Sequence, residues 1–347
     1  MKNHWILKQL KDILLTMSQA HSNTYLITGA AGFIGSQFVQ SCQQSGTTPL
    51  ISVDDKSHFS TRPEHQQLDY GTIIDRADLW DWLESSSTEQ VAQIDGILHL
   101  GAITDTQETN QDHLNTWNLD YSKRLWNYAT THQIPFVYAS SAATYGDGAL
   151  GYDDNEEKIP LLKPLNLYGQ SKQDFDLWVL EQERRGLHPP AWSGFKFFNV
   201  YGFGELHKGF MASVVLHSFE QIQKSGQVTL FKSHREGIAD GFQKRDFVYV
   251  DDVVRVLQFA LEKPIPRGIY NLGTGQARAF LDLSRAVFKA LNKKENILFV
   301  DTPLAIRDKY QYFTEARMQK LQDQGYSATF TSLEEGVSRY IKKLLSF

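Results

Sequence analysis

Two side chains that could transfer a proton stand four residues apart in the stretch YGQSK, at Tyr168 and Lys172. Residues at this spacing share one face of a helix, and the pattern predicts a helix from Tyr168 to about residue 184. A free phenol has a pKa near ~10 and is a poor base at neutral pH, whereas a neighbouring ammonium favours the phenolate. We therefore expect Lys172 to lower the pKa of Tyr168 and to make it an acid and base for a substrate oxygen.

Ser141 could hold the same oxygen by hydrogen bonding. It follows the predicted strand 136–140, in the run ASSAATYG. Of the 15 tyrosines, only Tyr168 has a lysine four residues further on, so composition alone does not account for the pair. A chance Tyr-Lys pair is the alternative for this motif taken alone.

The element that must position this chemistry starts at the apolar run Tyr25–Thr28, a predicted buried strand. A turn with three glycines spaced GxxGxxG follows it, at Gly29, Gly32 and Gly35. These would allow a tight turn, a close approach to a pyrophosphate, and close packing of helix on strand, with the helix N-terminus facing the anion. The stretch predicts a dinucleotide site, the alternative being an ordinary strand-to-helix turn.

The second predicted strand, 50–53, ends in Asp54 and Asp55, where an adenosine ribose would lie. An acid there favours the 2′-hydroxyl of NAD, whereas a nearby Arg or Lys is needed for the 2′-phosphate of NADP. The sequence offers both, because Lys56, Arg62 and Arg76 follow closely. NAD and NADP therefore both remain open from the residues.

Further strands should complete a parallel sheet. The run Gly96–Leu100 ends in Gly101 and Ala102, small residues that let a backbone lie under the cofactor. Asp69 follows a predicted short strand, 66–68. The glycine turn resembles that of the short-chain dehydrogenase/reductase superfamily, and this resemblance implies a side chain against the adenine at that position. A helix from about 112 to 131 carries Asn118, a candidate polar brace that we include among the cofactor residues.

A second lobe should bind the substrate. A predicted strand, Gly194–Val200, leads into NVYG and then a helix from about 211 to 224, while a later strand, 245–250, precedes a helix that Asp251 and Asp252 would cap. The segment 269–273 reads as a last core strand. Basic residues gather in this lobe although the chain is acidic overall, which fits a sugar-nucleotide diphosphate; they are Lys208, His217, Lys232, His234, Arg235, Lys244 and Arg245.

The composition is that of a globular protein: 347 residues, 41% hydrophobic, with a net charge of −5 that argues against nucleic acid as a partner. The single Cys42 excludes an intrachain disulfide and fits a cytoplasmic protein. No HExxH motif occurs, so we expect no metal site. Residues 1–22 read as an extension with no membrane-spanning run, and Met17 is an alternative start.

The expected fold is α/β: a Rossmann-like doubly wound parallel sheet with a smaller mixed α/β C-terminal substrate lobe. We assign residues 23–202 to the dinucleotide-binding domain, with 245–275 returning to it. Residues 203–244 and 276–347 are assigned to the substrate lobe.

The GxxGxxG turn resembles that of the short-chain dehydrogenase/reductase superfamily. From residue 24 onward the chain resembles its ADP-L-glycero-D-manno-heptose 6-epimerases, in ITGAAGFIGS, PFVYASSAATYG, KPLNLYGQSK, FFNVYGFGELHKGFMASV, KRDFVYVDDV, IYNLGTG and DKYQYFTEA. The resemblance implies cofactor contacts at Phe33, Ile34, Asp54, Asp55, Arg76, Leu100, Gly101, Ala102, Ile103, Thr104, Tyr168, Lys172 and Val200. It implies substrate contacts at Ser141, Asn199, Lys208, Phe210, His217, Phe231, Lys232, Ser233, His234, Arg245 and Tyr310.

The same resemblance implies NADP as cofactor, an ADP-heptose substrate, and a ring-like homo-oligomer, commonly a pentamer. It implies transient oxidation at C6 of the heptose, with Tyr168 and Lys208 as the two acid/base groups, Lys172 tuning Tyr168 and Ser141 holding the oxygen. A dehydratase is disfavoured, because Ala142 and Ala143 stand where related dehydratases carry an Asp-Glu pair. A UDP-sugar 4-epimerase is the alternative, since it needs the same serine, tyrosine and lysine, and a non-catalytic NADP sensor would need neither Tyr168 nor Lys172.

Overall fold

The computed structural model describes residues 23–46, 50–86, 94–263, 265–307 and 310–347; the N-terminal extension and Met17 lie outside these ranges. The larger part is a seven-stranded parallel sheet in the order β10-β6-β5-β4-β1-β2-β3. Its strands are β1 (Thr24–Thr28), β2 (Leu50–Asp54), β3 (Thr72–Asp75), β4 (Ile94–His99), β5 (Phe136–Ser141), β6 (Trp192–Phe197) and β10 (Gly268–Leu272). This is the expected doubly wound order, with its switch point between β1 and β4.

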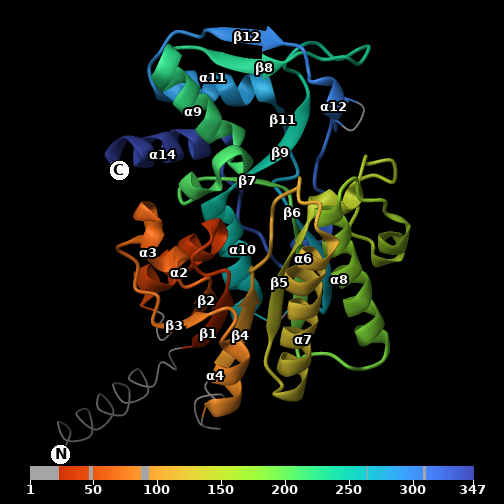
Figure 1. The fold of residues 1–347 in the computed structure, drawn as a ribbon. Helices are drawn as coiled ribbons and strands as arrows, with labels where there is room; N and C mark the ends of the chain where they lie inside the picture. The colour runs from red at the N-terminus through yellow and green to blue at the C-terminus, as the bar shows by residue number, and fades with distance from the viewer. Residues whose placement is uncertain (1–22, 47–49, 87–93, 264, 308–309) are drawn as a thin grey trace, which may run out of the picture.

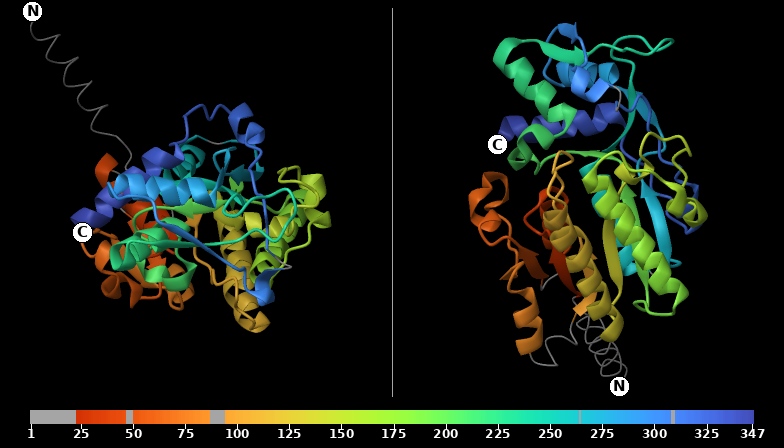
Figure 2. Two further views of the ribbon diagram at one scale, coloured as in Figure 1. Left: turned by 90° about the horizontal axis from the view of Figure 1, so that it is seen from above. Right: turned by 45° about the vertical axis from the view of Figure 1, so that its right-hand side comes forward.

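Helices cover this sheet, and a smaller lobe is stacked above it (Figures 1 and 2). The helices of the larger part are α2 (Phe33–Ser45), α3 (His58–Thr61), α4 (Leu79–Ser85), α6 (Gln111–Leu114), α7 (Tyr121–Thr131), α8 (Leu167–Arg184), α10 (Val250–Glu262) and α13 (Gln319–Asp323). Among them α2 packs on α10, and α8 packs on β5. Within the described residues, none of the helices has the length and apolar character that crossing a bilayer requires.

The smaller lobe holds two short sheets, β11-β9-β7 and β12-β8. Its elements are β7 (Asn199–Tyr201), β8 (Val228–Phe231), β9 (Lys244–Tyr249), β11 (Ala277–Ala279), β12 (Ile297–Val300), α9 (Val214–Ser225), α11 (Phe280–Ala290), α12 (Leu304–Arg307) and α14 (Leu333–Ser346). A second apolar cluster packs between these elements, separate from the core of the large sheet. Phe33, at the start of α2, belongs to this second cluster and so joins the two parts.

The prediction of a strand at 66–68 is wrong, because the structure has no strand there. A 3-10 turn, Pro63–His65, precedes that segment, and the amides of Gln66 and Leu68 donate to Pro63 and His65, so they are used locally. The third strand is β3, whose Thr-Ile-Ile sequence is rich in β-branched residues. Asp69 therefore lies in a turn, where its side chain accepts from the amide of Gly71.

The predicted strand 194–200 is two strands in different sheets. The amide of Phe198 donates to Leu272 in the large sheet, but the amide of Val200 turns back to the carbonyl of Phe198. This tight bend carries the chain from β6 into β7, which pairs with β9. The segment 245–275, predicted to return to the dinucleotide-binding domain, is also divided between the two parts. Its strand β10 pairs in the large sheet, whereas its strand β9 belongs to the lobe.

Two helix predictions need smaller corrections. Tyr249 precedes the first turn of α10, so Asp251 and Asp252 lie within that turn rather than at the cap. Asp252 instead accepts hydrogen bonds from Thr331, which fastens α10 to the C-terminal segment. The helix predicted from about 112 to 131 is interrupted by a π-helical segment, Asn115–Asp120.

Candidate active site

Two of the three glycines of the first turn are required by close backbone contacts. Gly29 has a φ of 70°, and a Cβ there would come within 2.7 Å of the amide nitrogen of Gly101. A Cβ on Gly35 would come within 2.1 Å of the carbonyl oxygen of Gly29. Gly32 precedes α2 without a side-chain cap, and no acidic residue occupies the first turn. The N-terminal amides of α2 are therefore not taken by a capping side chain, which fits a diphosphate.

A pocket of about 450 Å³ opens beside this turn, at the carboxyl ends of β1, β2 and β4. This volume suits a small-molecule site. Twelve predicted cofactor residues line it: Gly29, Gly32, Phe33, Ile34, Gly35, Asp54, Arg76, Leu100, Gly101, Ala102, Ile103 and Thr104. The predicted substrate residues Lys208 and Phe210 line its other side.

Other lining residues were not predicted as contacts, and some predicted residues lie elsewhere. The additional residues are Thr28, His58, Arg62, Asp105, Trp117, Tyr121, His207 and Met211. Of these, only Arg62 had a sequence signal, as a cation near Asp54. The predicted cofactor residues Asp55, Asn118, Tyr168, Lys172 and Val200 do not line this pocket.

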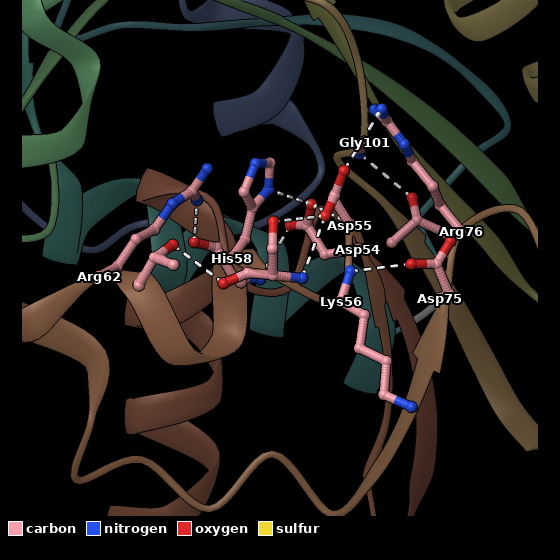
Figure 3. A network of polar contacts seen from close by, with 12 residues as sticks. Asp54, Asp55, Lys56, His58, Arg62, Asp75, Arg76 and Gly101 are labelled. Carbon is pink, nitrogen blue, oxygen red and sulfur yellow. Dashed lines mark hydrogen bonds and ion pairs between the residues drawn. The ribbon is translucent and has the colours of Figure 1, made fainter.

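Asp54 braces the glycine turn (Figure 3). Its Oδ2 accepts from the amide of Ala31 at 3.1 Å, and its Oδ1 accepts from the amide of Asp55 at 2.8 Å. The Nδ1 atom of His58 lies 2.9 Å from the same Oδ1. Both carboxylate oxygens of Asp54 thus have protein partners already, and only 11% of its side chain is exposed.

Three cationic residues follow Asp54 along the chain, and the structure places them differently. The guanidinium of Arg76 lies 4.2 Å from the ring centre of Trp117 and 3.8 Å from the carboxylate of Asp55. Arg62 donates to the carbonyl of Ala31, within the glycine turn. The third candidate, Lys56, is exposed and does not line the pocket.

Asn118 connects the pocket to the predicted catalytic helix. The π-helical segment turns its side chain inward, where it is 1% exposed. Its Oδ1 accepts from the amide of Ile103, and its Nδ2 donates to the carbonyl of Ile103 and to the hydroxyl of Ser171. The cofactor-side loop after β4 is thereby held against α8.

Tyr168 and Lys172 lie one turn apart at the start of α8, whose N-cap Asn166 accepts from the amide of Gly169. Burial raises the pKa of Tyr168, and a hydrogen bond with Ser141 acts in the opposite direction. Burial also lowers the pKa of Lys172 to about 8, against the opposing charge of Asp176. The expected low pKa of Tyr168 is not found in the protein alone, because burial outweighs the hydrogen bond with Ser141. The Lys172 ammonium donates to the carbonyl of Ala139 at 2.9 Å.

Lys208 lies in the turn between the two parts of the molecule. That turn is organised by Glu205, which is 1% exposed and accepts from the amide and hydroxyl of Ser213. Lys208 extends over the ring of Phe33, 5.6 Å from its centre, and burial lowers its pKa. An amine of the lobe is thus held against the first turn of α2.

Arg245 is a buried cation in the lobe, 8% exposed. Its guanidinium donates to the carbonyls of Lys244 and Gln311 and lies 5.5 Å from the ring centres of Phe280 and Tyr310. Phe231 packs edge-on against Tyr310. Within the described ranges, no carboxylate lies within ion-pairing distance of Arg245. A buried positive charge without a negative partner is costly unless a ligand supplies one.

The remaining predicted substrate residues are spread over the lobe surface. Lys232 pairs with Asp301 at 3.3 Å, the ring of His234 accepts from the amide of Thr302, and the amide of Ser233 donates to Asp240. The ring of His217 approaches the carbonyl of Phe210 at 3.4 Å. Asn199 is exposed on β7, next to the half-buried Val200.

Known proteins similar to this chain share its fold and its glycine-turn domain. The family model described as "NAD dependent epimerase/dehydratase family" matches residues 25–273. A curated ADP-L-glycero-D-manno-heptose-6-epimerase of Fusobacterium nucleatum is 43% identical over 92% of this chain and 98% of its own length. One of Nitratidesulfovibrio vulgaris is 41% identical over 93% of this chain and 98% of its own length.

Two solved structures resemble the fold. The crystal structure of Helicobacter pylori ADP-L-glycero-D-manno-heptose-6-epimerase has a TM-score of 0.75 and 26% identity, covering 94% of this chain and 98% of its own. MoeE5 in complex with UDP-glucose and NAD has a TM-score of 0.71 and 25% identity, covering 93% of this chain and 99% of its own.

The switch-point glycines, the pocket over them and the matching family model define the class. The chain belongs to the NAD dependent epimerase/dehydratase family. Within that family, its curated relatives at 41–43% identity are ADP-L-glycero-D-manno-heptose-6-epimerases.

Proposed function

We propose that this protein inverts C6 of the heptose in ADP-D-glycero-D-manno-heptose and releases ADP-L-glycero-D-manno-heptose, a precursor of lipopolysaccharide core. One observation carries the proposal: two groups able to move a proton come from different parts of the molecule, Tyr168 from α8 and Lys208 from the lobe turn. Two epimers present the C6 hydroxyl from opposite sides, so inversion benefits from two such groups. The names of the relatives at 41–43% identity support this substrate.

A bound nicotinamide cofactor supplies the reversible two-electron oxidation of C6. Tyr168 takes the proton of the C6 hydroxyl of one epimer, while the hydroxyl of Ser141 holds the same oxygen in place. Because burial raises the pKa of Tyr168, the phenolate needs a nearby positive charge, and the oxidised nicotinamide carries one. Lys172, which donates to the carbonyl of Ala139, orients the cofactor ribose.

Lys208 serves the opposite epimer. Burial lowers the pKa of Lys208, which brings the amine closer to the range in which a lysine exchanges protons at neutral pH. Arg245 holds the diphosphate of the substrate through its unpaired charge, and Tyr310 stacks on the base.

We assign NADP as the preferred cofactor. Both oxygens of Asp54 are occupied by protein donors, so this acid is poorly placed to accept from a ribose 2′-hydroxyl. Arg62, His58 and Arg76 all line the pocket and together suit a 2′-phosphate. We also propose a homo-oligomer, a pentameric ring, which light scattering of the purified protein tests.

Conversion in D2O tests the mechanism. If one bound cofactor oxidises and then reduces C6, the hydrogen of C6 never exchanges with solvent, and we expect no deuterium at C6 of the product by NMR and no requirement for added reductant. Lys208→Met should slow conversion strongly while the cofactor stays bound. Deuterium at C6 would overturn the redox cycle, and turnover of UDP-galactose in preference to the heptose would show that the substrate is a different nucleotide sugar.

A further inference from the structure

Three possible metal ligands meet between the larger part and the lobe. Glu64 and His65 come from the 3-10 turn Pro63–His65, and His207 comes from the turn that carries Lys208. One ligand atom from each lies within 4.8 Å of the other two. The side chains of Glu64 and His65 are about 1% exposed and that of His207 is 20% exposed. Residues more than 140 positions apart along the chain thus form one cluster, in which His65 is buried and His207 is exposed.

Among the residues that the structure describes, two buried atoms of this cluster find no hydrogen-bond partner: Nδ1 of His65 and Oε2 of Glu64. The hydroxyl of Ser36 donates to the carbonyl of Phe33, so at 3.0 Å it accepts from Nε2 of His65. The proton of a neutral His65 is therefore on Nε2, which leaves Nδ1 with a free lone pair. Were the proton on Nδ1, it would be a buried donor without an acceptor. Either way a buried polar atom lacks a partner among the described residues, which destabilises the folded protein.

The donor set of the cluster suits a cation. The cluster combines two imidazoles and one carboxylate, whose ligand atoms lie close together. This is the donor set of many zinc sites.

We propose that Glu64, His65 and His207 bind a divalent ion of the zinc class, with a fourth position open to solvent. The hydrogen bond from His65 to Ser36 is the outer-shell contact that fixes the tautomer of a metal-bound imidazole. His207 lines the cofactor pocket, so the ion has a path to the cluster. Bound metal would tie the turn holding Lys208 to the loop between β2 and β3. Arg62 and Lys208 are nearby cations that weaken the site relative to a closed structural zinc site.

Metal titration of the full chain tests this proposal. After treatment with a chelator, the protein is titrated with ZnCl2 by calorimetry and with Co²⁺ by visible absorption, which reports tetrahedral coordination. We expect one equivalent to bind, and we expect His65→Leu, Glu64→Gln and His207→Asn each to weaken binding at least tenfold. His58→Ala is the matched control, because His58 lines the same pocket outside the cluster and should leave metal binding intact.

Thermal melting separates metal binding from folding. His207 is the most exposed member, so His207→Asn should melt like the wild type in the presence of chelator. Zinc should raise the melting temperature of the wild type and of His58→Ala, but not of His207→Asn. If the wild type binds no zinc, the two unpartnered atoms are hydrogen-bonded to water instead. If the wild type and the cluster variants bind zinc equally, the metal lies elsewhere. Either result overturns the proposal.

Discussion

Lys196 and Asp176 form an ion pair of 2.6 Å in which neither side chain is exposed to solvent. Asp176 lies one turn after Lys172 on α8, and it also accepts from the hydroxyls of Ser140 and Tyr138. Because Ser140 directly precedes Ser141, this pair fixes the end of β5 relative to α8. The relative positions of Ser141 and Tyr168 therefore depend on a buried charge pair beneath them.

Removing one member of this pair should be far worse than replacing both. Asp176→Asn leaves the Lys196 ammonium buried without a counter-charge, so we expect a loss of about 3–5 kcal/mol in the free energy of unfolding. The double variant Asp176→Asn/Lys196→Met should recover most of that loss. Urea denaturation of the two single variants and the double variant measures the coupling. Additive losses would show that the two charges do not depend on each other.

Lys172 should make the free energy of unfolding depend on pH. Its pKa is about 8 in the folded protein, against an ordinary 10.5. Between these values the unfolded chain binds more protons, so stability rises as the pH increases through this window. The full displacement corresponds to roughly 3 kcal/mol.

Lys172→Met removes this contribution and serves as the comparison. The stability of the wild type relative to the variant should increase by up to roughly 3 kcal/mol between pH 7.5 and pH 10.5. Urea unfolding of both proteins at these two pH values measures it. A difference that stays constant with pH would show that Lys172 keeps its ordinary pKa after folding.

Tyr168→Phe should abolish most of the epimerisation while folding is kept. The change removes only the phenolic oxygen, and loss of a general acid/base typically costs about 10²–10⁴ in rate. Ser141→Ala should reduce kcat less, because it removes a hydrogen bond to the same oxygen but leaves the base. Cofactor released on denaturation should be unchanged in both variants. A fully active, folded Tyr168→Phe protein would exclude this tyrosine as the base.

Arg76 should discriminate between cofactors. If its guanidinium meets a 2′-phosphate, Arg76→Ala weakens NADP by about tenfold or more, because a charge-assisted hydrogen bond is worth about 1.5–3 kcal/mol. NAD should be affected much less. Lys56→Ala is the control, since Lys56 is an exposed cation outside the pocket. Equal losses of NAD and NADP affinity would show that Arg76 only supports Trp117 and Asp55.

Arg245→Met should raise the KM for substrate by at least tenfold without lowering stability. Methionine keeps the apolar stem beside Phe280 while it removes a buried charge that lacks a counter-ion among the described residues. Lys244→Met, at an exposed neighbouring position, should leave the KM near its wild-type value. Substrate-saturation curves, with urea denaturation alongside, measure both effects. A large loss of stability with unchanged KM would make Arg245 a structural residue.

The sequence by itself determined the larger part of the fold, because its signals are local. Two of the three motif glycines, Gly29 and Gly35, make backbone contacts that admit no Cβ. Short apolar runs correctly located β1, β2, β4 and β5. The four-residue spacing of Tyr168 and Lys172 likewise needs only a helix to place both side chains on one face. Strand 66–68 was predicted wrongly, since the competing 3-10 turn depends on local hydrogen bonds that periodicity does not reveal.

Only the tertiary structure decided how distant residues act on one another. Burial, which no spacing reports, raises the pKa of Tyr168. The packing of α8 on β5 brings the Lys172 ammonium to the carbonyl of Ala139. The bend at Phe198 sends one apparent strand into two sheets, and so brings Lys208 over Phe33. The meeting of Glu64 and His65 with His207 likewise had no sequence signal, because 142 residues separate the two turns and only the packing of the lobe on the sheet joins them.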